Sequence, residues 1–418
     1  MSSDDVFLDT AASIGREIVA DAVWHGRRCS WMGAAPTDPG QVWRTEYRAL
    51  EPNLYDGTAG VGLFLAQLAA VTGDAVIRRT AIGALRHAIS HAPAVPPDRR
   101  DGFHAGSLGV TWAAARAAVL LGEEELRHSA RKVLAAARPP SEGARRPDVV
   151  LGRAGSILAL LALAGALDDP TLAERAIAVG DELIGRATIT PHGWSWANPD
   201  RRGRHLLCGL SHGAAGIGWA LLELYAATGD SRFGTGATGA FAYERSWLDS
   251  ESGTWPDLRT GGQRRNMARR IASPAIGTWC HGEGGIALTR LRAIEVLGHE
   301  ACKRDAEFAL ETTRRHLATT LRYEIADLSL CHGAAGTADV LLCGAAALGG
   351  RWRDATKLSA ELGCAAIERH TTTDEDWPCD AAGGTTPGLF RGLSGIAWWF
   401  LRMHDPGIPS PLTFPICG

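Results

Sequence analysis

Two kinds of apolar pattern alternate along the chain. Amphipathic stretches carry apolar residues at helical spacing and charged residues on the other face, which predicts surface helices over 75–82, 124–137, 171–183, 300–317 and 353–369. Other segments, such as 63–66 and 396–399, are apolar almost throughout. A helix that is apolar on all sides must be buried, whereas an amphipathic helix can face water. The pattern therefore predicts an all-α protein with an inner and an outer helix layer.

Each apolar segment opens with the motif Gly-x-x-Gly. Seven copies, separated by roughly 45 to 70 residues, begin at Gly57, Gly106, Gly152, Gly213, Gly282, Gly333 and Gly392. A period in this range is typical of repeat architectures. We expect seven helical hairpins, each an outer helix followed by an inner one, closed into an α/α toroid. The glycines would let backbones approach closely where inner helices begin. Because the repeat runs from end to end, we expect one domain over 1–418.

If all inner helices begin at the same end of the ring, the residue before each first glycine points toward one central cavity. These seven residues are Asp56, Ala105, Leu151, His212, His281, His332 and Arg391. Helix capping explains a single such residue, and Asp56 can be a simple cap. Three histidines and an arginine in equivalent places are better explained by a functional site.

Two Cys-His pairs, Cys280-His281 and Cys331-His332, lie about fifty residues apart in equivalent positions of the repeat. Two thiolates and one or two imidazoles form a ligand set that suits zinc. We therefore predict a zinc site. The spacing leaves open whether His281 or His332 is the third ligand.

Composition narrows the class of protein. The formal net charge of −3 offers no basic field for nucleic acid. No apolar run is long enough to span a membrane, and residues 1–5 lack the features of a secretory signal. Nine cysteines, an odd number scattered over a long chain, suit reduced thiols better than a disulfide framework. We expect a cytoplasmic protein that is not integral to a membrane.

An insert over about 247–276 precedes the first Cys-His pair. It contains Trp255-Pro256-Asp257-Leu258-Arg259 and then a basic run through Arg264, Arg265, Arg269 and Arg270. Long irregular segments in compact repeats often have a function. The insert can wall the cavity or hold a peptide; the alternative is a solvated loop.

The ordered motifs resemble a known family. Ser211-His212-Gly213, Trp279-Cys280-His281-Gly282 and Cys331-His332-Gly333, set among serial Gly-x-x-Gly segments, are similar to those of the lanthionine synthetase C-like (LanC-like) cyclases. The resemblance covers nearly the whole chain. Residues 255–259 further resemble the cyclase half of bifunctional lanthipeptide synthetases. Because no region matches their dehydratase half, we expect a stand-alone cyclase that works with a separate dehydratase.

The resemblance implies an α/α toroid that holds Zn²⁺ through Cys280, Cys331 and His332. It also implies a catalytic histidine at His212 and a catalytic aspartate at Asp148. The substrate would be a dehydrated precursor peptide, with a leader and a core. Its cysteine thiolates would add to dehydroalanine or dehydrobutyrine, and (methyl)lanthionine rings would form.

The residues suggest a role for each group in that chemistry. An imidazole with a pKa near about 6.5 can carry the proton that the new α-carbon needs, which suits His212. Asp148 would orient that imidazole. From its place in the repeat, Arg391 can balance enolate charge, and His281 can position the substrate or hydrogen-bond a ligand.

A second hypothesis keeps the zinc but changes the reaction. The chain would then be a LanC-like protein that binds glutathione or a regulatory partner, or adds a thiol between molecules. A third, purely structural interpretation leaves the Cys-His pairs as core residues.

Overall fold

The glycine motifs set where the inner helices begin. The computed structural model describes residues 3–36, 45–136, 146–199, 206–260, 277–323, 325–373, 375–380 and 384–415. In it the first glycine of each of the seven predicted motifs has extended backbone conformation and is the N-cap of a buried helix. These inner helices are α2 (Thr58–Thr72), α4 (Ser107–Leu121), α6 (Arg153–Ala166), α8 (Ala214–Thr228), α10 (Glu283–Leu297), α12 (Ala334–Leu348) and α14 (Leu393–His404).

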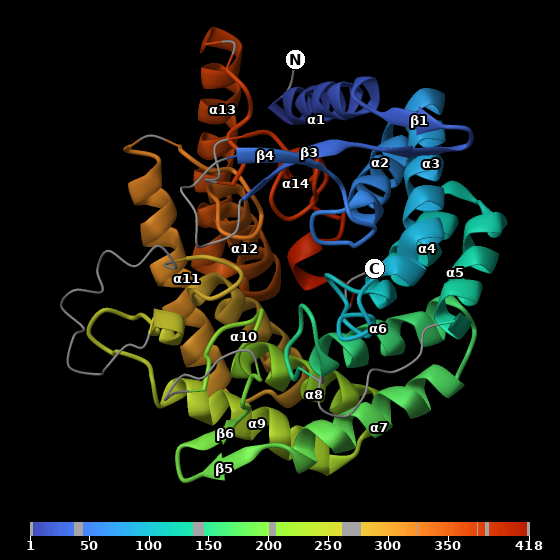
Figure 1. Cartoon of the computed structure of the whole chain (residues 1–418). Coiled ribbons are helices and arrows are strands. Elements are labelled where there is room, and N and C mark those ends of the chain that lie inside the picture. Colours follow the sequence, from blue (N-terminus) through green and yellow to red (C-terminus); the bar gives the residue numbers. More distant parts are fainter. Residues whose placement is uncertain are drawn as a thin grey trace.

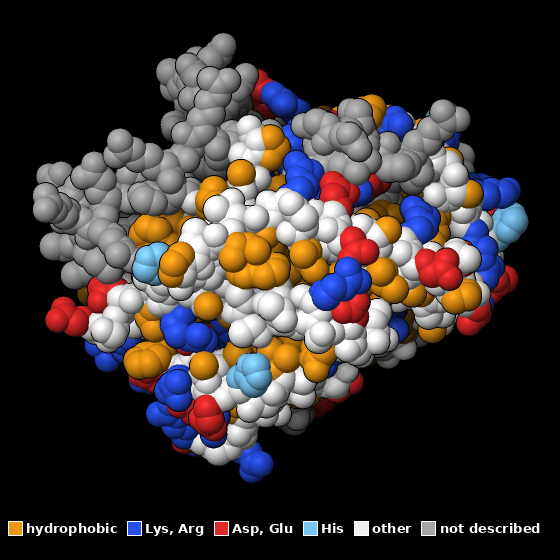
Figure 2. Space-filling model, turned by 90° about the horizontal axis from the view of Figure 1, so that it is seen from below, with side chains coloured by type: hydrophobic (Ala, Val, Ile, Leu, Met, Phe, Trp, Pro, Cys, Tyr) orange, Lys and Arg blue, Asp and Glu red, His pale blue; other side chains and the backbone are white. Residues whose placement is uncertain are grey.

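An outer layer of helices surrounds them, so the all-α toroid with an inner and an outer helix layer is confirmed (Figure 1). The outer helices are α1 (Ser3–Ala20), α3 (Ala75–His91), α5 (Glu124–Ala136), α7 (Thr171–Gly185), α9 (Ser231–Arg245), α11 (Glu300–Thr320) and α13 (Ala355–Thr373). They are amphipathic: α7, for example, buries Leu172, Ala176 and Leu183 and exposes its other side. Seen from below, the molecule carries charged side chains scattered among apolar ones (Figure 2).

The order of helices within a hairpin differs from the prediction. Each inner helix packs mainly on the outer helix that follows it, as α2 does on α3 and α8 on α9. The last inner helix, α14, packs instead on α1 from the other end of the chain. Phe7 of α1 stacks on Phe400 of α14 with ring centroids 6.1 Å apart. The two ends of the chain therefore close the ring together.

The second glycine of each motif is required by a close backbone approach. A Cβ atom at these seven positions would lie only 1.9 to 2.2 Å from a carbonyl oxygen six residues earlier. At Gly216 that oxygen belongs to Leu210, and at Gly336 to Leu330. No side chain fits in that space, so the motif follows from the way each loop folds back on its helix.

The loops before the first glycines, here called the pre-glycine loops, are joined in a closed circle. Each loop donates at least one backbone N–H to a carbonyl of the next loop, and the seventh donates to the first, over 2.8 to 3.2 Å. The pairs, donor first, are Tyr55–His104, Ala105–Val150, Val149–Ser211, Ser211–Cys280, Trp279–Cys331, Cys331–Phe390 and Phe390–Tyr55. This circle holds equivalent residues of all seven repeats at one end of the ring.

The structure also contains short strands, which the sequence pattern did not predict. Within the described part of the chain they form three antiparallel pairs: β1 (Val23–His25) with β2 (Arg28–Ser30), β3 (Met32–Pro36) with β4 (Thr45–Ala49), and β5 (Thr188–Thr190) with β6 (Gly193–Ser195). Single 3₁₀ turns occur at Ala92–Ala94, Leu258–Thr260, Gly350–Asp354 and Pro411–Thr413. Among the described helices, none combines the length and apolar character that a membrane span needs.

The predicted insert is described only up to residue 260 and from 277. Its first part packs on the ring, because Trp255 and Leu258 are buried. Arg264, Arg265, Arg269 and Arg270, the predicted basic run, lie outside the described residues.

Candidate active site

The fifth and sixth pre-glycine loops bring two thiols and an imidazole together. Cys280 Sγ, Cys331 Sγ and His332 Nδ1 all lie within 4.8 Å of one another. The sulfur of Cys280 is 3.9 Å from Nδ1 of His332. Both cysteines are free thiols. Two sulfurs and one imidazole nitrogen converging on a point leave a fourth tetrahedral position, so these residues can hold a metal ion with an open site.

The third donor is fixed from behind by a carboxylate. Nε2 of His332 lies 3.1 Å from Asp380 Oδ1, and the other Asp380 oxygen pairs with the guanidinium of Arg391. Burial would raise the pKa of Asp380, but His332 and Arg391 outweigh it and lower that pKa to about 2. A carboxylate on the remote nitrogen is the usual partner of a metal-bound histidine, because it fixes the tautomer that leaves Nδ1 free.

Arg391 therefore contacts Asp380, the carboxylate that also pairs with His332. Its predicted role in substrate binding stays a prediction. Asp380 was not predicted, because it lies outside the Gly-x-x-Gly segments and its sequence position gives no sign of His332.

A tyrosine hydroxyl contacts one of the two sulfurs. Tyr55 Oη donates to Cys331 Sγ over 2.8 Å, and its ring stacks on Phe390 with centroids 5.1 Å apart. Tyr55 precedes Asp56 and so occupies the position that holds cysteine in the fifth and sixth repeats. Tyr55 could have been identified from the sequence by this equivalent position in the repeat.

The two thiols differ in acidity. A hydrogen bond between them lowers the pKa of Cys280 well below its usual value, against the opposing effect of burial. Burial and the neighbouring Cys280 raise the pKa of Cys331. Burial alone would lower the pKa of His332, but hydrogen bonding to Asp380 and Cys280 raises it to about 10. These shifts favour the thiolate form at Cys280 over that at Cys331, and the protonated form of the His332 imidazole.

The fourth pre-glycine loop carries His212 beside Asp148 from the third. His212 Nδ1 lies 3.0 Å from Asp148 Oδ2, with 24% of the histidine side chain exposed and 0% of the aspartate. The other Asp148 oxygen accepts the backbone N–H of Leu151 over 2.7 Å. Asp148 therefore acts as a local cap and also faces the imidazole. His212 keeps Nε2 available for a proton-transfer partner.

His281 lies between these two groups. Its ring is 5.5 Å from that of His212, centroid to centroid, and it follows Cys280 in the chain. Nε2 of His281 is 3.3 Å from Ser211 Oγ. Burial lowers the pKa of His281 to about 4, so the ring is neutral near pH 7. His281 is absent from the convergent donor set, which takes His332 instead.

The remaining register residues, Asp56, Ala105 and Leu151, lie at the same end of the ring and are partly exposed. A cavity of about 560 Å³ lies at the other end of the inner helices, lined by Trp112, Leu161, Glu223 and Arg292 among others. Among the described residues, neither cysteine nor histidine lines it. We place the candidate active site at the Cys-His cluster because the chemically capable groups converge there.

Fold and site together define an α/α toroid with a Cys₂His cluster and an Asp-His pair at the end where its inner helices begin. The family described as lanthionine synthetase C-like protein matches residues 48–416, and the chain belongs to this family.

Solved structures of the same shape include nisin cyclase. It superposes with a TM-score of 0.65 at 16% sequence identity, covering 85% of this chain and 89% of that one. This likeness shows the fold. Weaker matches are a GH76 α-mannanase from Bacteroides thetaiotaomicron (TM-score 0.49, 10% identity, 96% and 95% covered) and a cellobiose 2-epimerase from Spirochaeta thermophila (0.47, 14%, 97% and 98%).

Metal content tests the cluster directly. We expect about one metal ion per chain in wild type and its loss in Cys280→Ala and in Cys331→Ala, because each variant removes one of three donors. Cys364→Ala removes an exposed thiol of α13 and should keep the metal. Elemental analysis of dialysed protein is the measurement. Wild-type protein that stays metal-free after zinc is supplied would contradict the assignment.

Proposed function

We propose that this chain is a zinc-dependent lanthionine cyclase. It would close thioether rings by adding peptide cysteines to dehydroalanine or dehydrobutyrine in the same chain. The observation that carries the proposal is the placement of a Cys₂His donor set beside an Asp-supported histidine. The family match and the fold of nisin cyclase support it.

The donor set fits zinc. Two thiolates and one neutral imidazole are borderline-soft ligands that neutralise a divalent ion and suit a tetrahedral catalytic site. Cys280, Cys331 and His332 would hold it, with Asp380 orienting His332 and Tyr55 donating to Cys331. Bound zinc supplies a Lewis acid that keeps a coordinated substrate thiol deprotonated at neutral pH.

The reaction needs one proton delivered to carbon. The substrate sulfur forms a bond to the β-carbon, and the C=C electron pair moves toward the α-carbon and its carbonyl to give an enolate. His212, partly exposed and with Nδ1 3.0 Å from Asp148 Oδ2, would donate a proton to the α-carbon. Asp148 stabilises the imidazolium before transfer and keeps the ring in one orientation.

The same histidine can take the proton that the incoming thiol releases. The thiol proton would then return to carbon, and the cycle would consume no external acid. His281, neutral and buried beside both centres, would shape the space between them. Loss of a proposed zinc ligand should therefore lower the zinc content, whereas loss of His212 should lower the rate of ring closure and leave the zinc content unchanged.

Ring closure can be measured although it leaves the mass unchanged. The substrate is a dehydrated precursor peptide that carries cysteines together with dehydroalanine or dehydrobutyrine. We expect zinc-loaded wild type to protect its cysteines from alkylation, seen by mass spectrometry. His212→Asn should keep zinc but slow closure by about 10²- to 10⁴-fold, because a general acid–base group is lost.

Cys364→Ala is the matched control and should close rings like wild type, and a reaction without enzyme sets the background. Thiols that stay free with the zinc-loaded wild type would contradict the proposal. If they stay free while glutathione becomes attached to the peptide, thiol addition between molecules is favoured instead.

Zinc binding should release protons. At pH 7.5 the metal-free cluster carries protons on His332, whose pKa is about 10, and on Cys331, whose pKa is raised by burial. Both must leave before the atoms bind metal, so about two protons are released per zinc and affinity falls about 100-fold per unit drop in pH. Calorimetry in two buffers of different ionisation enthalpy counts these protons. A pH-independent affinity would contradict the ligand set.

A further inference from the structure

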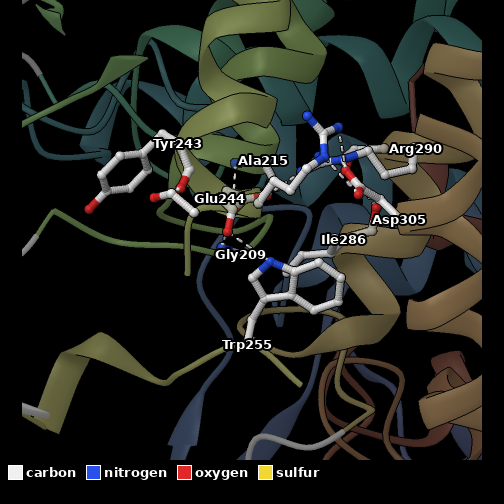
Figure 3. A network of polar contacts seen from close by, with 11 residues as sticks. Gly209, Ala215, Tyr243, Glu244, Trp255, Ile286, Arg290 and Asp305 are labelled. Atoms are coloured by element: carbon white, nitrogen blue, oxygen red, sulfur yellow. Dashed lines mark hydrogen bonds and ion pairs between the residues drawn. The ribbon is translucent and has the colours of Figure 1, made fainter. Parts of the chain in front are cut away.

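A buried carboxylate holds both ends of the loop that carries His212. Glu244, in the last turn of α9, has an exposed fraction of 0%. Its Oε1 accepts the backbone N–H of Gly209 over 2.7 Å and that of Ala215 over 3.0 Å (Figure 3). These two residues lie three positions before and three positions after His212. One oxygen atom therefore fixes the loop on either side of the proposed proton donor.

The charge of Glu244 is balanced inside the protein. Arg290 of α10, also fully buried, places Nη2 2.9 Å from Glu244 Oε2 and Nε 3.3 Å from Asp305 Oδ2 (Figure 3). Arg245 pairs with the same aspartate over 2.7 Å. Two cations and two anions thus form one network across α9, α10 and α11.

Such a network adds little to stability compared with apolar packing. Desolvation of buried charges roughly offsets their attraction, and apolar residues of similar volume are often as stable or more so. What the network does supply is direction, because each oxygen of Glu244 faces specific donors. The main effect of the network is therefore to fix the position of the loop that carries His212.

The loop that carries His212 is also hydrogen-bonded to the loop of the Cys-His cluster. Ser211 N donates to the carbonyl of Cys280 over 2.9 Å. Gly209 has φ +94°, and a Cβ atom there would lie 2.9 Å from Cα of His281, so only glycine fits. The loop around His212 is therefore held at residues 209, 211 and 215, and two of those three points depend on Glu244.

The start of the insert rests on the same residue. Trp255 Nε1 donates to the Glu244 carbonyl over 3.0 Å, and Trp255 N donates to the buried carboxylate of Glu283 over 3.1 Å. Glu283 also accepts from Gly277 N, which lies beyond the far end of the insert. Glu244 thus links the anchored insert to the loop of His212.

We propose that Glu244 is a positioning residue for His212: its buried carboxylate, backed by Arg290, sets the distance and orientation of that imidazole relative to the Cys-His cluster. This inference rests on the proposed function. It predicts that loss of the carboxylate harms proton transfer while zinc binding and substrate affinity persist.

The test compares two carboxylate-to-amide variants. Glu244→Gln keeps the size of the side chain but turns an N–H₂ group toward Arg290 or toward the loop amides. Glu223→Gln is the matched control: Glu223 of α8 is 5% exposed and pairs with Arg292 over 2.7 Å, between inner helices and without a bond to any pre-glycine loop. Zinc content is measured in both variants.

For cyclisation we expect kcat of Glu244→Gln to fall about 100-fold with KM unchanged, as for a misplaced catalytic group. Zinc content should stay at the wild-type value, and the control should retain its kcat. If Glu244→Gln does not fold, Arg290→Lys keeps the charge but loses the fork that holds Oε2, and a smaller fall in kcat is expected. A kcat equal to that of the control would overturn the proposal.

A second readout needs no substrate. The His212 imidazole signal in the NMR spectrum of histidine-labelled protein, assigned with His212→Gln, should change its titration midpoint in Glu244→Gln and not in Glu223→Gln. An unchanged His212 signal would overturn the proposal. If the wild type closes no rings, the proposed function fails, and this signal alone decides the role of Glu244.

Discussion

The circle of backbone hydrogen bonds between the pre-glycine loops is the constraint on which the site depends. Buried N–H and C=O groups without partners are costly, so segments that enter the interior must find partners in one another. Here each loop satisfies its neighbour, and Phe390 donates to Tyr55 to complete the circle. The second glycine of each motif makes this possible, because its hydrogen atom leaves room for the carbonyl that folds back over the helix.

The circle converts a sequence repeat into a functional arrangement. Because equivalent residues of all repeats lie at one level, a few substitutions at two adjacent positions are enough to build a reactive centre. Cys280 and Cys331 occupy one position, and His212 and His332 the next. Residues outside the repeat then refine the site: Asp380 holds His332, and Glu244 holds the loop of His212. The repeat therefore places the reactive side chains, and residues outside the repeat orient them.

The sequence could predict what repeats. Seven glycine motifs and two apolar patterns specified the inner helices, most outer helices and the convergence of the cysteines. The packing of α1 on α14 could not be predicted from the sequence, because a local pattern does not indicate which helix completes a closed ring. For a related reason, the sequence did not predict the roles of Asp380, Glu244 and Glu283. Their partners are backbone or side-chain atoms that only folding brings near. An acidic residue in a helix or loop is normally interpreted as part of the solvated surface.

The central claim is that two cysteines and one histidine of this ring hold zinc with a position left for a substrate thiol. X-ray absorption at the zinc edge of the loaded protein measures this most directly. The account predicts two sulfur neighbours at about 2.3 Å and two lighter ones at about 2.0 Å, one of which is replaced by sulfur when a thiol is added. A shell of nitrogen and oxygen alone, or a sulfur number that does not rise with added thiol, would contradict it.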